Sequence, residues 1–293
     1  MSVPPAHPSA PLSAHSAAVP ALVAVAQEVA RAAGSLVRDG RPADLGVAAT
    51  KSSAVDVVTA MDLASEELVR AMLARLRPDD GILGEEGGHE PGTSGVTWVV
   101  DPIDGTVNYL YGLPAYAVSV AAVVGEPTPA TWTVLAGCVH APETGETWTA
   151  GRGRGATLDG RRLTLADAPA LDRCLLGTGF GYVAERRRSQ ARVLAVLLPQ
   201  VRDVRRIGAA AIDLCQVATG RLDLYYERGL QPWDLAAAAL VVTEAGGVVR
   251  GLRGLPAGPD MVVAGSAERV AELVTKLEEL GADDPDPPGD DVG

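Results

Sequence analysis

Five apolar segments follow one another between residues 81 and 151, and they restrict the possible folds more than any other feature of this chain. Their sequences are GILGEE, VTWVVDP, AYAVSVAAVV, TVLAGCVHAP and GETWTAG. Each is either continuously apolar or alternates polar with apolar residues, which is typical of β-strands. Residues 20–38 and 62–76 instead carry apolar side chains at helical spacing. Asp39 and Gly40 are expected to end the first helix, and the apolar face of the second is expected to contain Leu63, Leu68, Met72, Leu73 and Leu76. The first half of the chain therefore predicts two helices followed by a large sheet.

The pattern changes near residue 151. The segment GRGRGATLDGRRL is rich in glycine and arginine and predicts turns with a short hairpin. Beyond it, strand-like segments such as CLLGTG and DLYYE alternate with helical ones such as RSQARVLAVLLPQV and PWDLAAAALVV. This alternation indicates an α/β arrangement. We therefore predict a mixed α/β (α+β) protein in two halves, residues 19–155 and residues 156–280.

Size, charge and cysteine content exclude several classes of protein. A chain of 293 residues is too long for one small core, and its 47% of hydrophobic residues can build a large one. With 25 basic and 37 acidic residues the net charge is −12, which argues against a nucleic-acid or membrane-surface partner. The three cysteines are far apart and form no CxxC pair, so neither a zinc site nor a disulfide framework is expected.

The two ends of the chain differ from the rest in composition. Residues 1–18 are rich in Pro, Ser and Ala, and residues 281–293 are acidic, so we expect both to be disordered tails. The first residues contain no early Lys or Arg and do not look like a secretory signal. No stretch reaches the roughly 18 apolar residues of a membrane span. We expect a cytoplasmic protein.

Carboxylates stand at the ends of apolar segments in four places: VDVVTAMD, LGEEGG, WVVDPIDGT and PWDLAAAA. Each place also has an ordinary explanation. Asp62 and Asp234 can be helix N-caps, Glu85 can belong to a solvated turn, and Asp101 with Pro102 can start a turn. Together, however, they are costly to bury unless a cation neutralises them, and Mg²⁺ prefers oxygen ligands. The combination favours a metal site.

The residues that follow Asp104 suit an anion. If a helix starts near Gly105, its first N–H groups are free to bind a phosphate, and its dipole favours negative charge. Gly105 allows a close approach of the backbone, and Thr106 adds a hydroxyl group. A phosphate site beside carboxylate-bound metal ions indicates metal-assisted hydrolysis of a phosphoester.

Two segments together resemble a known family. WVVDPIDGTVNYLYGLPAYAVSVA is similar to the first signature of the inositol monophosphatase family, and PWDLAAAALVVTEAGGVV is similar to its second. The resemblance extends over roughly residues 20–280. It implies the layered αβαβα sandwich of the inositol monophosphatase and fructose-1,6-bisphosphatase type. It also implies a lithium-sensitive phosphatase that uses two or three Mg²⁺ ions, with Mn²⁺ as a substitute, and that forms a homodimer.

The resemblance assigns roles to the matching positions. The implied metal ligands are Glu85, Asp101, the backbone carbonyl of Ile103, Asp104 and Asp234. Glu85, Thr106 and Asp62 are the implied catalytic residues, which activate the attacking water. The positions implied for substrate binding are Asp104, Gly105, Thr106, Gly208, Ala210, Glu227 and Asp234. Lys51 matches a lysine of the family's mobile loop. Ala209 stands where the family has a hydroxyl residue.

The same resemblance implies a reaction. A metal-activated water attacks the phosphorus of a small phosphorylated metabolite directly, and inositol-1-phosphate is the leading substrate. Histidinol phosphate, fructose 1,6-bisphosphate and 3′-phosphoadenosine-5′-phosphate are alternatives, because related phosphatases share the scaffold. The non-enzyme alternatives are a regulatory partner-binding protein and a structural metal-binding protein. The presence of every implied ligand weighs against the regulatory protein, and the Gly105–Thr106 phosphate site against the structural one.

Overall fold

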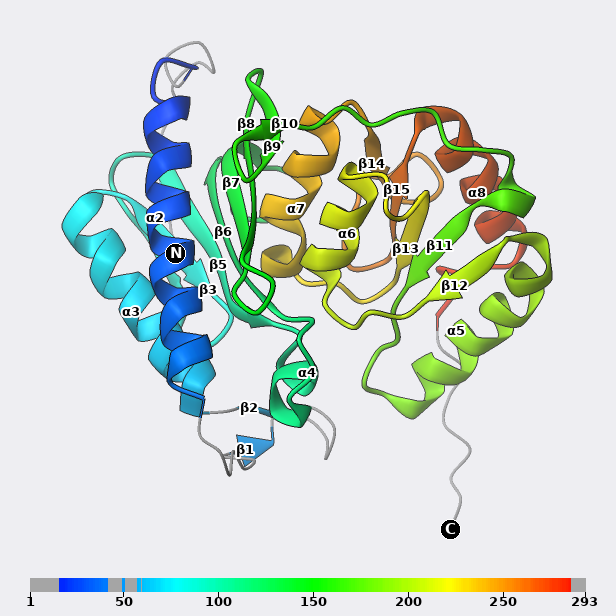
Figure 1. Cartoon of the computed structure of the whole chain (residues 1–293), viewed down its shortest axis with the longest axis horizontal. Helices are drawn as coiled ribbons and strands as arrows, with labels where there is room; N and C mark the ends of the chain where they lie inside the picture. The colour runs from blue at the N-terminus through cyan, green and yellow to red at the C-terminus, as the bar shows by residue number, and fades with distance from the viewer. Residues whose placement is uncertain (1–15, 42–48, 51–56, 59, 286–293) are drawn as a thin grey trace, which may run out of the picture.

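The computed structural model describes residues 16–41, 49–50, 57–58 and 60–285. Most of the two expected tails and Lys51 lie outside these residues. The described chain forms five layers, helices, sheet, helices, sheet and helices, from left to right in Figure 1. The αβαβα sandwich expected from the sequence is thereby confirmed.

The first helical layer consists of α2 (Val19–Asp39) and α3 (Ala60–Leu76). Helix α2 buries an apolar face of Leu, Val and Ala against the large sheet and ends at Gly40, as predicted. Helix α3 begins two residues before the predicted start, and Leu63, expected on its buried face, is 53% exposed. Its buried residues are Asp62, Ser65, Glu66, Val69 and Leu73. The N-terminal part of this face is therefore polar.

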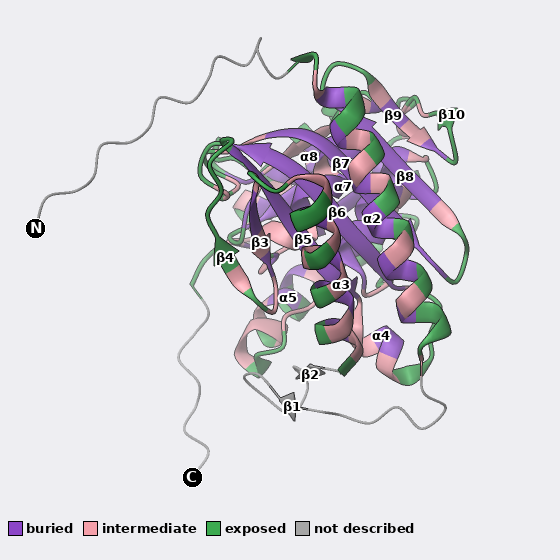
Figure 2. Ribbon diagram, turned by 90° about the vertical axis from the view of Figure 1, so that its left-hand side faces the viewer, coloured by how far each residue is buried: buried purple, intermediate pink, exposed green. Residues whose placement is uncertain are grey.

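The second layer is an eight-stranded sheet with the order β10-β9-β8-β7-β6-β5-β3-β4 among the described residues. Its strands are β3 (Gly81–Gly84), β4 (Gly88–Glu90), β5 (Val96–Asp104), β6 (Ala117–Val124), β7 (Thr133–Ala141), β8 (Glu146–Gly151), β9 (Gly155–Leu158) and β10 (Arg161–Arg162). Neighbours are antiparallel except β3 and β5. Helices cover both faces, so the central strands are buried almost throughout (Figure 2). This explains their continuous apolar runs.

The remaining layers come from the second half of the chain. The smaller sheet has the order β12-β11-β13-β15-β14. Its strands are β11 (Leu175–Thr178), β12 (Asp203–Arg205), β13 (Leu224–Glu227), β14 (Val248–Arg250) and β15 (Val262–Gly265). Helices α6 (Ala210–Ala218) and α7 (Pro232–Glu244) lie between the sheets, and α5 (Ala184–Leu197) and α8 (Ala267–Glu279) cover the outer face (Figure 1). The described chain also contains α4 (Thr106–Tyr111), the short helices η1 (Leu171–Arg173) and η2 (Leu198–Gln200), and the pair β1 (Ala49–Thr50) and β2 (Val57–Val58).

One hydrophobic core joins the two halves. It contains Val99 and Val139 of the large sheet, Leu214 of α6, Val241 of α7 and Tyr225 of β13, all essentially inaccessible to solvent. Because such interiors are close-packed, residues at the junction of the halves are held rigidly. Strands β9 and β10 belong to the large sheet, so the part of the sequence that forms this sheet extends to Arg162.

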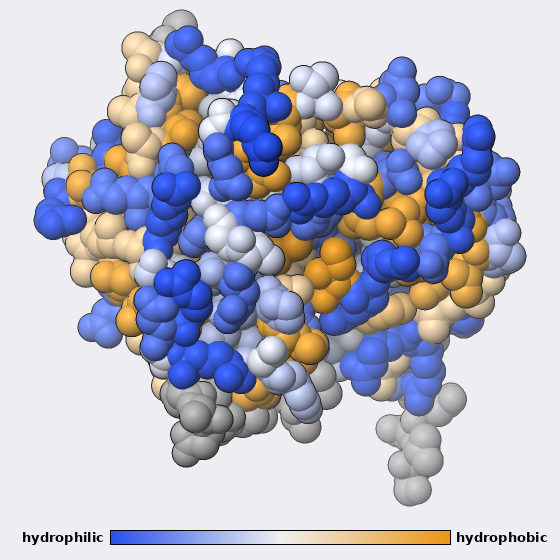
Figure 3. All heavy atoms as spheres, in the orientation of Figure 1, coloured by the Kyte–Doolittle hydropathy of each residue, from blue (hydrophilic) through white to orange (hydrophobic). Residues whose placement is uncertain are grey.

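No helix of the described residues is long and apolar enough to span a membrane. On the face shown in Figure 3, hydrophilic residues are interspersed among hydrophobic ones.

Candidate active site

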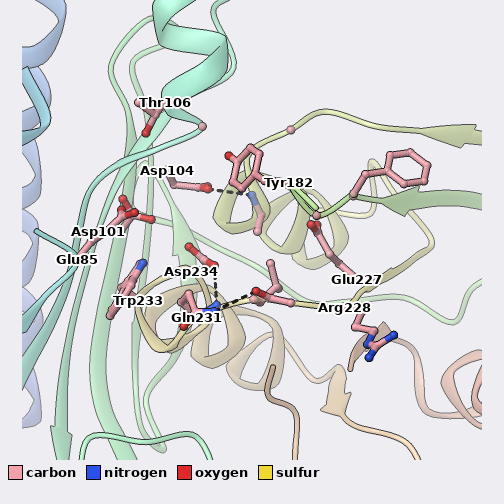
Figure 4. A pocket seen from close by; sticks show the side chains of 18 of the residues that line it. Glu85, Asp101, Asp104, Thr106, Tyr182, Glu227, Arg228, Gln231, Trp233 and Asp234 are labelled. Carbon is pink, nitrogen blue, oxygen red and sulfur yellow. Dashed lines mark hydrogen bonds between the residues drawn. The ribbon is translucent and has the colours of Figure 1, made fainter. Parts of the chain in front are cut away.

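The end of strand β5 is irregular, and this irregularity places two carboxylates together. The pairing of β5 with β6 shifts register between Asp101 and Asp104. Pro102 has no N–H for the ladder, and its carbonyl accepts a hydrogen bond from the Ser65 hydroxyl at 3.1 Å. The Asp101 carboxylate accepts the N–H of Ile103 at 3.0 Å. The bulge thus directs Asp101 and Asp104 toward one space (Figure 4).

The chain turns sharply after Asp104. Gly105 has φ = +91°, a left-handed conformation that favours glycine, and helix α4 starts at Thr106. A Cβ atom at Gly105 would lie 2.9 Å from the carbonyl oxygen of Ala115 and 3.1 Å from Cβ of Ala209. A side chain at this position therefore strains the backbone and crowds the turn.

A third carboxylate joins the two of β5 from helix α7. Oxygen atoms of Asp101, Asp104 and Asp234 all lie within 4.8 Å of one another. Asp234 is the third residue of α7 and forms a capping box with Gln231, whose N–H it accepts at 2.7 Å. The N-cap of α7 is thus Gln231 and not Asp234, which caps the start of the helix from its third position and also belongs to the acidic cluster. Ser119 of β6 donates its hydroxyl to the carbonyl oxygen of Trp233 at 3.2 Å and ties the start of α7 to the large sheet.

The electrostatics of the cluster fit a bound cation. Burial raises the pKa of Asp101 well above its usual value, and the charges of Glu85, Asp104 and Asp234 raise it further. Burial and the charge of Asp234 likewise raise the pKa of Asp104. The hydrogen bonds from the N–H groups of Ala211 and Ala210 lower it, but by less. Such crowding is unfavourable for carboxylates alone, and a hard cation with oxygen ligands relieves it. The donor set therefore fits a divalent metal ion.

Thr106 links the cluster to helix α3. Its Oγ1 lies 3.2 Å from Oδ1 of Asp62 and 3.0 Å from the carbonyl oxygen of Ile103. A hydroxyl group has one hydrogen, so it donates to one of these acceptors at a time, and its lone pairs stay available. Asp62 is 1% exposed and lies within α3, not at its N-cap. The pair brings a buried carboxylate into contact with a hydroxyl that lines the cavity.

Glu66 shapes the turn that carries Glu85, although no sequence motif pointed to a role for it. Its carboxylate accepts the N–H groups of Glu86 and Gly87, both at 2.8 Å, and pairs with Arg70 at 2.8 Å. Glu66 is only 2% exposed. A Cβ atom at Gly84 would overlap this carboxylate, so a larger residue there would displace Glu66 from the turn. The available signal was a polar residue at a helical position that faces the sheet.

These groups line one cavity of about 450 Å³ between the two halves of the chain. The acidic cluster forms one wall, with Gly208 and Ala210 beside it, and the opposite wall is formed by Glu227 and the loops 179–183 and 228–231. Burial raises the pKa of Glu227 to about 7, while the Tyr225 hydroxyl, which donates to it at 2.5 Å, acts in the opposite direction. Figure 4 shows Glu227 across the space from Asp101 and Asp104.

The structure brings the predicted site residues together. Those that line the cavity are Glu85, Asp101, Ile103, Asp104, Gly105, Thr106, Gly208, Ala210, Glu227 and Asp234. Asp62 reaches it through Thr106. Residues that we did not predict, such as Glu66 and Ser119, act behind this lining.

Comparison with known proteins agrees with this geometry. Residues 20–280 match the sequence profile of the inositol monophosphatase family. The chain belongs to this family. It is thus an enzyme of the phosphoric monoester hydrolase class, in a metal-dependent family.

Individual members of the inositol monophosphatase family align over nearly the whole chain. Inositol-1-monophosphatase SuhB of Mycobacterium tuberculosis is 44% identical over 286 residues, which cover 91% of this chain and 96% of that protein. Nus factor SuhB of Pseudomonas aeruginosa is 38% identical and covers 87% of this chain and 94% of its own length. The solved structure of Mycobacterium tuberculosis SuhB has a TM-score of 0.76 at 44% identity, over 90% of this chain and 98% of that one.

Proposed function

We propose that this protein is a magnesium-dependent phosphomonoesterase whose substrate is inositol-1-phosphate. The observation that carries the proposal is the cluster of Asp101, Asp104 and Asp234 directly beside the Gly105–Thr106 turn. An acidic cluster alone indicates only a cation site. The turn adds backbone N–H groups that can bind a phosphate, and the cavity is large enough for a small molecule. A cation site in such surroundings supports hydrolysis of a phosphate ester.

The residues divide into four groups in this proposal, which act on the metal ions, the phosphate, the attacking water and the leaving alcohol. Glu85, Asp101, the Ile103 carbonyl, Asp104 and Asp234 hold Mg²⁺, with Mn²⁺ as a substitute. Bound there, the metal ions polarise the phosphoryl oxygens and lower the pKa of a water molecule. Backbone N–H groups at Gly105 and Thr106 bind the phosphate oxygens, which fixes the phosphorus relative to the cluster.

The chain's own groups then orient the water and receive its proton. The Thr106 hydroxyl donates to Asp62 and accepts a hydrogen from the attacking water, which aligns the water with the phosphorus. Glu85 takes up the proton as general base. The leaving alcohol departs toward Asp234 and is protonated by a water molecule there.

Groups on both sides of the cavity select the alcohol. Glu227 and Asp104 offer carboxylate oxygens to hydroxyl groups of the substrate, and Gly208 and Ala210 offer backbone groups. Several acceptors around one small space favour a polyhydroxylated ring such as inositol. The 44% identical protein named inositol-1-monophosphatase adds support for this choice.

Phosphate release tests the proposal. Protein freed of metal with a chelator is supplied with Mg²⁺, with and without Li⁺, and offered inositol-1-phosphate, histidinol phosphate, fructose 1,6-bisphosphate and 3′-phosphoadenosine-5′-phosphate. We expect the highest kcat/KM for inositol-1-phosphate, no release without Mg²⁺, and inhibition by Li⁺. A higher kcat/KM for another ester rejects the substrate. No release from any ester by folded protein that binds Mg²⁺ rejects the phosphatase itself. The expected homodimer and cytoplasmic location stay predictions.

A further inference from the structure

Gln190 lies on helix α5, behind the wall that faces the leaving alcohol. It is almost completely buried, 8% exposed. Its Oε1 accepts the N–H of Gly181 at 2.9 Å, and its Nε2 lies 3.4 Å from the carbonyl oxygens of both Gly179 and Arg228. One side chain therefore contacts both loops of the wall, 179–183 and 228–231.

These two loops follow the neighbouring strands β11 and β13, and the backbone hydrogen bonds between the strands do not extend into the loops. Strands β11 and β13 are parallel and pair up to Thr178 and Tyr226. Gly179 follows Thr178 directly, Arg228 is the second residue after Tyr226, and both line the cavity. The amide of Gln190 thus continues the connection at the point where the ladder stops. An amide group suits this position, because it accepts from one backbone N–H and donates to carbonyl oxygens.

The spacing of the loops determines the position of Glu227. Gly179 packs directly against the carboxylate of Glu227, so closely that a Cβ atom would overlap it. The Tyr225 hydroxyl holds the same carboxylate from the other side. Displacement of loop 179–183 therefore changes the place where Glu227 meets the alcohol, while Asp101 and Asp104, at the end of β5, keep their geometry.

We propose that Gln190 is a positioning residue that sets the distance between loops 179–183 and 228–231 and thereby the selectivity for the alcohol of the substrate. Gln190 contacts neither the Gly105–Thr106 turn, which binds the phosphate in the proposed function, nor the cluster of acidic residues. The part of the proposal that concerns selectivity rests on the proposed phosphatase function, whereas the connection between the loops does not.

The test compares Gln190→Met with Val193→Ala. Methionine keeps the length and helix propensity of glutamine but loses the amide. Val193 lies on the same helix, is 7% exposed and packs in the outer core, so its truncation destabilises α5 without touching either loop. Two measurements are made on each variant, amide hydrogen exchange of segments 178–183 and 228–231, and KM and kcat for two esters.

Hydrogen exchange tests the connection without any substrate. We expect Gln190→Met to speed exchange in both segments by roughly tenfold, since the Gly181 N–H loses its acceptor, and Val193→Ala to leave them unchanged. If Gln190→Met fails to fold, Gln190→Glu replaces it. This variant keeps the acceptor for the Gly181 N–H but loses the donor to the carbonyl oxygens of Gly179 and Arg228. We therefore expect it to speed exchange in segment 228–231 while the Gly181 N–H stays protected. Unchanged exchange in both segments overturns the proposal.

Kinetics test the selectivity. Inositol-1-phosphate is compared with glycerol 2-phosphate, whose three-carbon alcohol is smaller than the inositol ring and carries fewer hydroxyl groups for the wall to contact. We expect Gln190→Met to raise KM for inositol-1-phosphate by roughly tenfold, with kcat and both constants for glycerol 2-phosphate within about twofold of wild type. Equal changes for both esters, or the same change in Val193→Ala, overturn the selectivity. If wild-type protein releases phosphate from neither ester, the phosphatase proposal fails, and hydrogen exchange still decides whether Gln190 connects the loops.

Discussion

The carboxylate of Asp104 accepts the backbone N–H of Ala211 at 2.8 Å, although the two residues are 107 positions apart in the sequence. A second bond from the N–H of Ala210 measures 3.0 Å. Asp104 therefore ends β5 of the large sheet and also caps the N-terminus of α6. One carboxylate serves both the acidic cluster and the junction between the two halves, so its removal affects stability as well as chemistry.

Comparison of Asp104→Asn with Asp101→Asn distinguishes the structural role of Asp104 from the role in the acidic cluster that both residues share. We expect turnover to fall at least about 100-fold, and the free energy of unfolding in the presence of a chelator to fall by about 1–3 kcal/mol, because an amide NH₂ faces a backbone N–H. Asp101→Asn is the matched control. Its oxygen can still accept the Ile103 N–H, and it relieves repulsion, so we expect equal loss of turnover without loss of stability. Urea unfolding and phosphate release measure both effects. Equal destabilisation by the two variants contradicts the capping role of Asp104.

Thr106→Val tests the contact with Asp62. Valine has nearly the shape of threonine but cannot donate to the buried carboxylate or orient a water molecule. We expect kcat to fall roughly 100- to 1,000-fold, with little change in Mg²⁺ affinity. Thr106→Ser keeps the hydroxyl and is expected to stay within about tenfold of wild type. A serine variant as inactive as the valine one would show that the methyl group, not the hydroxyl, matters.

Glu66→Gln tests the support of the Glu85 turn. The amide can accept only one of the two N–H groups that Glu66 now accepts, and it loses the ion pair with Arg70. We expect Mg²⁺ affinity to fall roughly tenfold, measured by calorimetric titration, together with a loss of about 1–3 kcal/mol in the free energy of unfolding. Glu67→Gln, the same change on the exposed side of α3, is expected to behave as wild type. Unchanged Mg²⁺ affinity in Glu66→Gln would mean that the turn keeps Glu85 in position without the Glu66 carboxylate.

The sequence predicted the groups at the surface of the site better than those behind them. Glu85, Asp101, Asp104 and Asp234 stand at the ends of apolar segments, so local pattern was sufficient. Glu66 was missed because apolar periodicity was used to orient α3, and this choice buried Leu63, which is in fact 53% exposed. The buried N-terminal face of α3 is determined by polar partners in β5, at the start of α4 and in the turn between β3 and β4. The spacing of apolar residues within the helix does not reveal these partners.

Short edge strands were also not predictable. Strands β4, β12 and β14 have three residues each and are only partly buried. Such strands lack the apolar run by which the central strands were recognised, since they exist through pairing with a neighbour. Gln190 was missed for a related reason, because its partners lie in loops that only the parallel pairing of β11 and β13 brings together.

Asp213, a buried carboxyl group of α6, predicts a dependence of stability on pH. Burial and the charges of Glu227 and Asp104 raise its pKa from 3.8 to about 9. The charge of Arg206 and the hydrogen bond from the Gly208 N–H act in the opposite direction. The folded protein therefore keeps a proton that the unfolded chain releases. This contribution to stability is complete below about pH 4 and is lost as the pH rises toward about 9.

Asp213→Asn is expected to remove that dependence. The free energy of unfolding of wild-type protein should fall with pH by up to about 1.4 kcal/mol per unit more steeply than that of the variant, between about pH 5 and pH 8. The variant should be the more stable protein at the upper end of this range. Urea unfolding at several pH values measures both slopes, with the exposed Asp172→Asn as the control that follows wild type. Parallel slopes for wild type and Asp213→Asn would mean that Asp213 is ionised in the folded protein and that a neighbouring positive group neutralises it.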